Sequence, residues 1–437
     1  SILPTSELTL PEIFTAQNSR FGMAAYGKWH LGGTANAPSV RGGWPEFAGI
    51  RRGGVTNYTL WDKLENGTTT EDVTSYTTTD QVNEGTDFIV SKGTNPWFLW
   101  MAFNAPHTPF HSPPSNLAPV GGYSTSGSSN SDQYIRALEA LDTEIGRLLT
   151  VVDLNRTNVI VIGDNGTPGQ VVQAPFGNGH AKGDLYQGGI HVPLFAVGPD
   201  IRITGTTDKL VHCVDLFSTI LDLGGIDGNA ATAGFSTHSQ SLLPIFHGTD
   251  TASRCVIAEK FGDNNGNGRA LISDVYPDYK LIIFGDKDDI SDTPIFELYN
   301  LPSDANEQTN LLLSPLSNEA QSAYDHLLAK DLALGGGYSD SPAGSFDTIY
   351  IELPNRTGPT SPPNNLSVNP TAIIIDGQSA SFVAREDSSG TAQRYWVKCS
   401  LTPGTGGPFT SATVTFPNNP NTGGARSFNS TQIIANP

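Results

Sequence analysis

Two patterns of apolar residues alternate along the first 250 residues of the chain. In the longer segments apolar side chains recur with helical spacing, as near Pro11, before Gly93 and most clearly over residues 131–152. The shorter segments, among them Phe21–Tyr26 and the runs WFLWMAF, VIVI and PLFAV, are apolar throughout, which is typical of strands buried on both faces. This alternation predicts an α/β fold, an α/β/α sandwich around a mainly parallel sheet.

The pattern changes at about residue 250. Short strand-like segments separated by turn residues are followed by a helical segment, which together predict a small antiparallel sheet with a helix. A stretch with the Pro, Ser and Asn content of a linker comes next, and then short runs that alternate apolar and polar residues. We therefore predict four parts: an α/β domain at 1–250, an antiparallel C-terminal subdomain at 251–335, a linker at 336–370 and a β-rich appendage at 371–437.

Net charge narrows the classes of partner. The chain has 437 residues, with 24 Lys+Arg against 43 Asp+Glu and a formal net charge of −19. A nucleic-acid-binding surface needs a basic stripe, so this balance argues against nucleic acid as a partner. Because an acidic surface repels anions at long range, any site for an anionic substrate must be a local basic pocket.

Composition also bears on location and on cross-links. The 47 Gly and 30 Pro residues, together with abundant Ser and Thr and several Asn-x-Ser/Thr sequons, favour a secreted or periplasmic glycoprotein. No apolar run in the sequence has the length of a membrane span. The three cysteines, Cys213, Cys255 and Cys399, allow at most one disulfide and one free thiol.

Short polar clusters follow the predicted strands or lie between glycines, where α/β folds place their chemistry. They contain Lys28 and His30 in AAYGKWHLGG, His107 in FNAPHTPFHSPP, Asp164 and Asn165 in VIVIGDNG, and Lys182 in GNGHAKGD. Lysine and histidine bind oxyanions, and the Asp–Asn pair offers oxygen ligands for Ca²⁺ or Mg²⁺. Each cluster also has a plain structural interpretation: solvated loop residues for the cations, and an Asx turn for Asp-Asn-Gly.

Taken together and in this order, the segments YGKWHLG, FNAPHTPFHSP, GDNGT and GHAKGDLYQGGIHVP resemble the sulfatase family of the alkaline-phosphatase-like superfamily. Framing segments such as ALEALDTEIGRLL, VDLFSTILDLGGI and FELYNLPSDANEQTNLL are similar to the family as well. The resemblance covers Leu8 to about Leu313. It implies an alkaline-phosphatase-like fold and hydrolysis of sulfuric esters, with a phosphoric or phosphonic ester hydrolase as the alternative within the superfamily.

The resemblance also implies a role for each cation. Lys28 and His30 would contact the nucleophile and a sulfate oxygen, while His107 and Lys182 would bind the sulfate, one of them aiding protonation of the leaving group. Transfer of a charged sulfuryl group rests on positioning and charge stabilisation, which a local cluster of cations supplies. The expected substrate is a small anionic ester, such as an aryl sulfate, or a sulfated polysaccharide.

The metal site and the nucleophile depart from the family pattern. Asp164 and Asn165 would be two ligands of a Ca²⁺ ion, with Mg²⁺ as the alternative, but Ca²⁺ takes about 6–8 oxygens and the family's paired N-terminal aspartates have no counterpart in this sequence. The family's formylglycine nucleophile arises in a C/S-x-P-x-R motif, which is also missing. Gln187 and His191 stand where the family usually has Glu and Arg, and we expect them to brace their loop.

Two explanations for these departures are open. In the first, the nucleophile-bearing N-terminal block belongs to the full protein and is missing from this chain, which opens in what reads as the middle of a fold. In the second, the protein is a non-catalytic extracellular relative with a binding or structural role. We expect the first, because a non-catalytic relative has no need of all four cationic residues.

Overall fold

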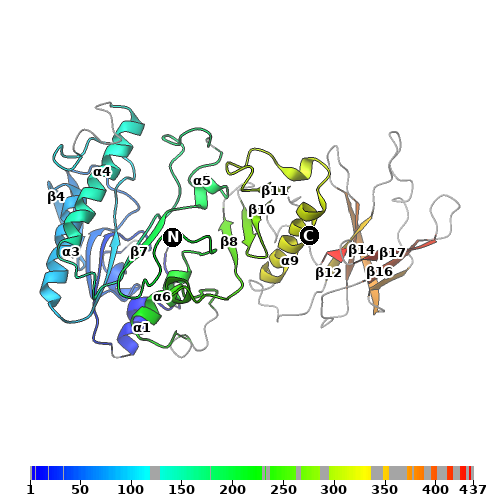
Figure 1. Ribbon diagram of the computed structural model, residues 1–437, viewed down its shortest axis with the longest axis horizontal. Coiled ribbons are helices and arrows are strands. Elements are labelled where there is room, and N and C mark those ends of the chain that lie inside the picture. The colour runs from blue at the N-terminus through cyan, green and yellow to red at the C-terminus, as the bar shows by residue number, and fades with distance from the viewer. Residues whose placement is uncertain are drawn as a thin grey trace. The chain divides into compact units, whose positions relative to one another are not determined.

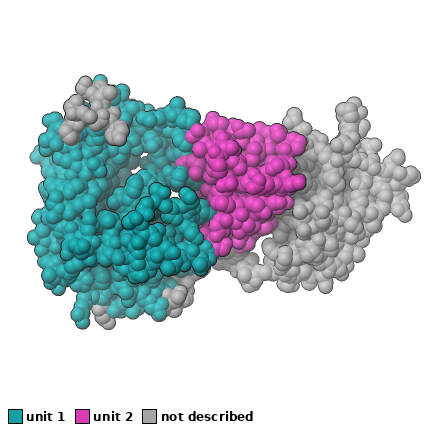
Figure 2. Space-filling model, viewed as in Figure 1, with its two compact units in different colours: residues 1–183, 188–252 teal, residues 184–187, 253–437 magenta. Residues whose placement is uncertain are grey.

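The computed structural model describes most of the chain, and the chain divides into two units. One unit comprises residues 1–183 and 188–252, and the other comprises residues 184–187 and 253–437 (Figure 2). The described residues are 2–4, 6–17, 19–32, 34–118, 128–177, 179–228, 232, 237–261, 267–285 and 295–335, together with the backbone of strands at 348–353, 372–375, 378–387, 395–400, 411–416, 424–429 and 433–434. The four parts expected from the sequence are a finer division than these two units and stay a prediction.

A five-stranded sheet forms the centre of the first unit (Figure 1). In pairing order its strands are β4 (Thr68–Val73), β3 (Trp61–Glu65), β2 (Glu46–Ile50), β1 (Gly22–Lys28) and β5 (Trp97–Ala102). Strand β1 pairs parallel with β2 and with β5, whereas β3 pairs antiparallel with β2 and with β4. The sheet is therefore mixed rather than mainly parallel.

The antiparallel edge arises from a tight turn that the apolar pattern did not reveal. Asn66 and Gly67 join β3 to β4 with φ values of 46° and 90°. Two successive positive φ values are those of a type I′ turn, which reverses the chain within a hairpin. Residues 71–73 consequently belong to β4, and the helix expected before Gly93 is α3 (Thr77–Lys92).

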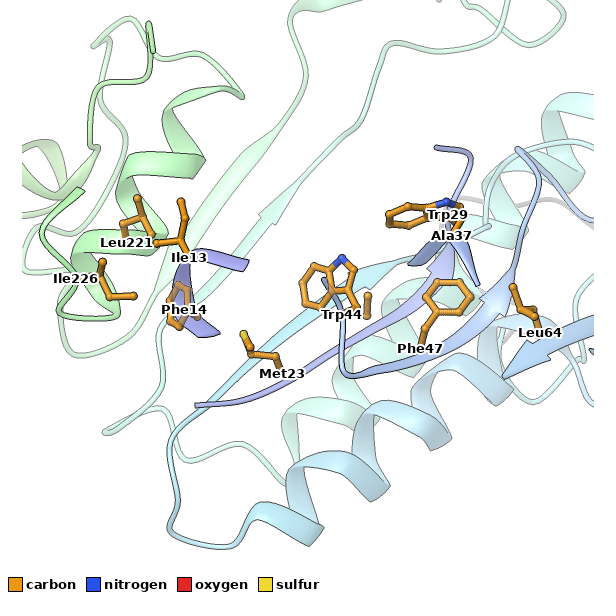
Figure 3. Close-up of a cluster of buried hydrophobic side chains, with 11 residues drawn as sticks. Ile13, Phe14, Met23, Trp29, Ala37, Trp44, Phe47, Leu64, Leu221 and Ile226 are labelled. Atoms are coloured by element: carbon orange, nitrogen blue, oxygen red, sulfur yellow. The ribbon is translucent and has the colours of Figure 1, made fainter. Parts of the chain in front are cut away.

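Helices cover both faces of this sheet, which confirms the α/β/α sandwich. Ala24 and Tyr26 of β1 pack with α3 and with α4 (Asn130–Leu149). Met23 and Ala25, on the opposite face, pack in a cluster with α1 (Leu10–Ala16) and α6 (Asp215–Leu223) (Figure 3). The alternation of inward faces along β1 explains why this strand is apolar throughout.

A second, two-stranded sheet in the same unit is formed by β6 (Val159–Ile162) and β7 (Leu194–Val197), which pair antiparallel. One of its faces packs on α6 and on α8 (Leu243–Phe246). The other face is open in the part of the chain that the structure describes, and its exposed side chains are Val161, Phe195 and Val197. The remaining short helices are α2 (Ala37–Val40), α5 (Gln187–Ile190) and the 3₁₀ helix η1 (Leu311–Leu313).

The second unit contains the antiparallel sheet that the sequence predicted. Its strands pair in the order β11, β10, β9, β8, and the helix α9 (Asn318–Gly335) packs on it through a core of aliphatic side chains. The strand bounds are β8 (Cys255–Lys260), β9 (Gly268–Ser273), β10 (Tyr276–Phe284) and β11 (Ile295–Asn300).

The C-terminal residues form a separate seven-stranded antiparallel sheet, in the order β17, β16, β13, β14, β15, β12, β18. Its strands are β12 (Thr348–Leu353), β13 (Ala372–Ile375), β14 (Gln378–Asp387), β15 (Tyr395–Ser400), β16 (Ser411–Phe416), β17 (Gly424–Asn429) and β18 (Ile433–Ile434). Strand β12 lies inside the segment whose composition predicts a linker, and it pairs with β15 and β18. Cys213 and Cys255 carry free thiols, and the side chain of Cys399 lies outside the described part.

Candidate active site

Lys28 and His30 lie at the carboxyl end of β1, as the sequence predicted. The pairing with β2 continues beyond the strand, since the N–H of His30 donates to the carbonyl of Arg51 at 3.1 Å. A Cβ on Gly27 would lie 2.0 Å from the carbonyl oxygen of Ala102, and its φ is 111°. Only glycine therefore lets β1 approach β5 so closely just before Lys28.

Two glycines at the end of β2 make room for the two candidate histidines. A Cβ on Gly53 would lie 2.6 Å from the His30 ring, and a Cβ on Gly54 would lie 3.1 Å from Nδ1 of His107. His30 and His107 therefore pack against adjacent residues of one loop. The parallel pairing of β2, β1 and β5 causes this, because the carboxyl ends of parallel strands meet at one edge of the sheet.

His107 is held in place by Tyr58, a residue that belongs to none of the motifs found in the sequence. The buried Tyr58 hydroxyl lies 2.8 Å from the carbonyl oxygens of both Asn104 and His107 and donates to them. His111 stacks on the Tyr58 ring with centroids 3.9 Å apart. Nδ1 of His107 lies 3.0 Å from the carbonyl oxygen of Thr108 and 3.3 Å from its hydroxyl oxygen. Because the carbonyl can only accept, the shorter contact favours a hydrogen on Nδ1, which leaves Nε2 for a ligand.

Asp164 and Asn165 lie in the turn after β6, and Asp164 reaches the end of β1. Its Oδ2 is 3.8 Å from Nζ of Lys28, and its side chain is 74% exposed. Asn165 uses its Nδ2 to donate to the carbonyl of Gly166 at 3.2 Å, which leaves Oδ1 for a ligand. The turn is supported from outside, because the N–H of Gly166 donates to the carbonyl of Gly189 at 2.9 Å.

Lys182 lies on a loop that is tied to this turn. Its N–H donates to the carbonyl of Thr167 at 2.9 Å. Tyr134 of α4 lies beside this loop. Burial and the charge of Asp164 raise the pKa of Tyr134, and a hydrogen bond with Thr167 opposes this shift. Its ring packs edge-on against that of Phe110, with centroids 6.2 Å apart. In the sequence Tyr134 is one position of the helical pattern over residues 131–152, with no motif around it.

Electrostatics connects the four cations. His30 is exposed to solvent on one side, and partial desolvation of its ring lowers its pKa below the ordinary value. The charges of Lys28, His107 and Lys182 lower this pKa further. Lys28, His107 and Lys182, which come from three separate segments, therefore lie near enough to His30 to repel a proton on its ring. Such repulsion is relieved when an anion binds among them.

The described residues do not complete a metal site. Within the described ranges, no group of three or more His, Cys, Asp and Glu side chains converges as metal ligands do. Asp164 and Asn165 offer oxygens on one side of the cluster, whereas Ca²⁺ takes about 6–8. The exposed Asp164 carboxylate is suited to a cation, but this pair by itself does not fit a resident Ca²⁺.

Known proteins resemble this chain over its first unit and beyond. Residues 1–226 match the Sulfatase family model. An uncharacterized sulfatase from Escherichia coli, YdeN, is 27% identical over 258 residues, which are 51% of this chain and 44% of that protein. The chain spans less than half the length of this relative and of other curated sulfatases that it matches.

Solved structures share the fold. The crystal structure of Ps i-CgsB in complex with k-i-k-neocarrahexaose superposes with a TM-score of 0.61 and 19% identity, over 76% of this chain and 74% of that one. The structure of BT4656 in complex with its substrate D-glucosamine-2-N,6-O-disulfate gives a TM-score of 0.57 and 18% identity, over 76% and 83%. In the described part of the chain, no helix is both long and apolar enough to cross a membrane.

Proposed function

The chain belongs to the sulfatase family, and from this premise we propose that it acts in the hydrolysis of sulfuric esters, with Lys28, His30, His107 and Lys182 binding the sulfate group. The observation that carries the proposal is that His30 and His107 pack against the adjacent residues Gly53 and Gly54, where the charges of Lys28 and Lys182 also act on the His30 ring. In a protein with a net charge of −19, a cluster of cations is a local exception that suits an anionic group.

In this reaction these four residues act through their charges and protons and do little covalent chemistry. Hydrolysis of a sulfate ester consumes one water and produces sulfate and an alcohol. An oxygen derived from water becomes bonded to sulfur, the bond between sulfur and the leaving oxygen breaks, and the leaving oxygen gains a proton. The two lysines act as fixed charges that stabilise the sulfuryl oxygens. Lys182 and His107 are the candidates for protonating the leaving oxygen, His107 as the imidazolium, which carries a hydrogen on Nε2 as well as on Nδ1. His30 is a poor proton donor at neutral pH because its pKa is lowered, so we assign it to binding a sulfate oxygen.

A sulfated glycan is the substrate class that we propose. The structural neighbours named above were solved with a carbohydrate hexamer and with a disulfated glucosamine, which supports this choice for the present fold. Secretion or a periplasmic location is the corresponding proposal for where the protein acts. Ca²⁺ at Asp164 and Asn165 is part of the proposal only as a partial ligand set, and no catalytic step is derived through it.

Sulfate release tests the assignment. The chain, and separately the product of its full reading frame, is incubated with a sulfated oligosaccharide and with 4-nitrophenyl sulfate, with and without a chelator. Lys182→Ala and His107→Ala are expected to lower kcat by about 100- to 1,000-fold, as loss of one charge-stabilising group does. Lys209→Ala is the matched control, because Lys209 is in the same unit but pairs with Asp250 at 3.1 Å.

The outcomes separate the candidate functions. Release of phosphate from 4-nitrophenyl phosphate at a higher rate than sulfate would favour the phosphoric ester alternative. Sulfate binding in calorimetry that Lys182→Ala abolishes, without turnover by the full reading frame, would favour a non-catalytic relative. That alternative is kept because no C/S-x-P-x-R motif occurs in the sequence.

A further inference from the structure

Residues 184–187, which follow Lys182 almost directly, are each fixed to the antiparallel sheet of the second unit. Asp184 pairs with Lys260 at 2.9 Å, and Leu185 is 1% exposed. The Tyr186 hydroxyl donates to Glu297 at 2.8 Å. Four consecutive residues thus leave the first unit, become part of the second, and return at residue 188.

Gln187, the last of the four, is bound by a buried ion pair. Lys280 and Glu307 have fully buried side chains, and Nζ of Lys280 lies 2.6 Å from Oε1 of Glu307. The other carboxylate oxygen of Glu307 accepts from the N–H of Gln187. Lys280 also donates to Oε1 of Gln187 at 3.4 Å. A neutral amide at position 187 leaves the buried charges balanced one to one.

Stability alone is a weak reason for such a pair. Removing two charges from water is costly, and apolar replacements of buried ion pairs are often neutral or stabilising. Glu307 also has a φ of 56°, a left-handed backbone that a non-glycine residue adopts at a cost. Besides bonding to each other, Lys280 and Glu307 each make a hydrogen bond to Gln187. We therefore explain the pair by the residue that it positions.

The chain on each side of Gln187 leads to residues of the candidate site. Lys182 lies five residues before Gln187, and its own N–H donates to the carbonyl of Thr167. On the other side, Gly188 and Gly189 touch the Asp164–Asn165 turn: a Cβ on Gly166 would lie 1.9 Å from the carbonyl oxygen of Gly188. A shift of Gln187 therefore has backbone consequences for Lys182 and for this turn.

We propose that Lys280 and Glu307 are positioning residues that hold Gln187 and thereby set the placement of Lys182 and of the Asp164–Asn165 turn. The inference rests on the proposed sulfate-binding role of Lys182. It adds a residue pair from the second unit to the requirements for activity, and it gives Gln187, where the family resemblance expects Glu, a defined function as the uncharged partner of a balanced pair.

The test replaces the pair by apolar residues. Lys280→Met combined with Glu307→Leu removes both charges and the partners of Gln187, and thermal denaturation checks that the fold is kept. The readout is the rate at which acetic anhydride modifies Lys182, measured by mass spectrometry relative to Lys209 in the same molecule, with and without saturating sulfate. We expect the Lys182 rate to change at least threefold, sulfate protection to be lost, and kcat to fall by up to about 100-fold with a smaller change in KM.

A matched control lies in the same sheet. Arg269 and Asp331 form an ion pair between β9 and α9 whose side chains are 18% and 4% exposed. Arg269→Met combined with Asp331→Leu should leave the Lys182 rate and its sulfate protection unchanged. If the Lys280/Glu307 double variant does not fold, Gln187→Glu replaces it, because this change adds a carboxylate beside Glu307 without touching the pair itself.

The proposal is overturned if the folded variant keeps the native Lys182 rate and sulfate protection, or if the control variant alters them equally. Failure of the proposed function is a different result. Native protein that neither releases sulfate nor is protected by it at Lys182 refutes sulfate binding, whereas the change in the unprotected Lys182 rate still tests the positioning by Lys280 and Glu307.

Discussion

His30 links local structure to the behaviour expected of the site. Partial desolvation of its imidazole and the charges of Lys28, His107 and Lys182 lower its pKa below the ordinary value, so the neutral form predominates at pH 7. For the free protein the sign is clear: the unfolded chain binds the proton more readily, so the His30 contribution to stability falls as pH drops from the ordinary value near 6.5 through the folded pKa.

We expect an anion to reverse this shift. Sulfate bound among the cations favours the imidazolium form, so it should raise the pKa of His30, and its affinity should increase as pH falls. Titration of the His30 ring protons by NMR, with and without sulfate, measures both values, and calorimetry at pH 5.5 and 7.5 measures the affinity. A pKa near 6.5 that sulfate leaves unchanged would contradict the proposed cluster.

Gly53 offers a test of geometry without a change of charge. A methyl group there would lie 2.6 Å from the His30 ring, and the exposed ring can swing away. Gly53→Ala should therefore leave the free energy of unfolding nearly unchanged, yet lower kcat/KM by about tenfold or more, since misplacing one group by about 1 Å can cost up to about 100-fold. Equal activity of Gly53→Ala and the native protein would show that the ring position is unimportant.

At this scale the sequence identified the candidate site residues better than the residues that hold them in place. Lys28, His107 and Lys182 stand in short motifs beside glycine or proline, so the neighbouring sequence is enough to identify them. Tyr58 acts on His107 from 49 positions away, and no local pattern reveals such a contact. Supports of this kind depend on how strands pair, which is a property of the fold.

Among the elements, the helix α4 carries a glycine that stability does not need. Gly146 is exposed in the interior of α4, and an added Cβ would meet nothing within 4 Å. Gly146→Ala is expected to raise the free energy of unfolding by about 0.5–1 kcal/mol, because alanine loses less backbone freedom in a helix. Chemical denaturation measures this change, and unchanged kcat makes the variant a control for Gly53→Ala. A loss of stability would mean that α4 packs differently around this turn.

Strand and helix positions followed from periodicity, while strand direction did not. Periodicity located α4, β1 and β5 because their apolar patterns are strong. The antiparallel edge depended on one Asn–Gly dipeptide between β3 and β4, whose φ values fix the reversal. The turn formed by these two residues determines the direction of β4 relative to β3, whatever the composition of the two strands.

Across the whole molecule, contacts between distant parts of the sequence limited what could be predicted. Gln187 contacts Glu307 across 120 positions, and Asp184 contacts Lys260 across 76. Strand β12 pairs with β15, although composition assigns its residues to a linker. Composition reports the average tendency of a segment, whereas pairing depends on which partner strand is available.

The net charge of −19 is a property of the whole chain that should be visible in kinetics. A polysulfated substrate is repelled by the acidic surface before it reaches the cationic cluster. Salt screens this long-range repulsion, since the Debye length falls from about 30 Å at 0.01 M to about 8 Å at 0.15 M, and it affects short-range contacts in the cluster less. We expect kcat/KM for a polysulfated oligosaccharide to rise about three- to tenfold over this range, and that for the singly charged 4-nitrophenyl sulfate to change little. A steady fall for the oligosaccharide would instead indicate binding along an extended basic surface, which the charge balance of this chain argues against.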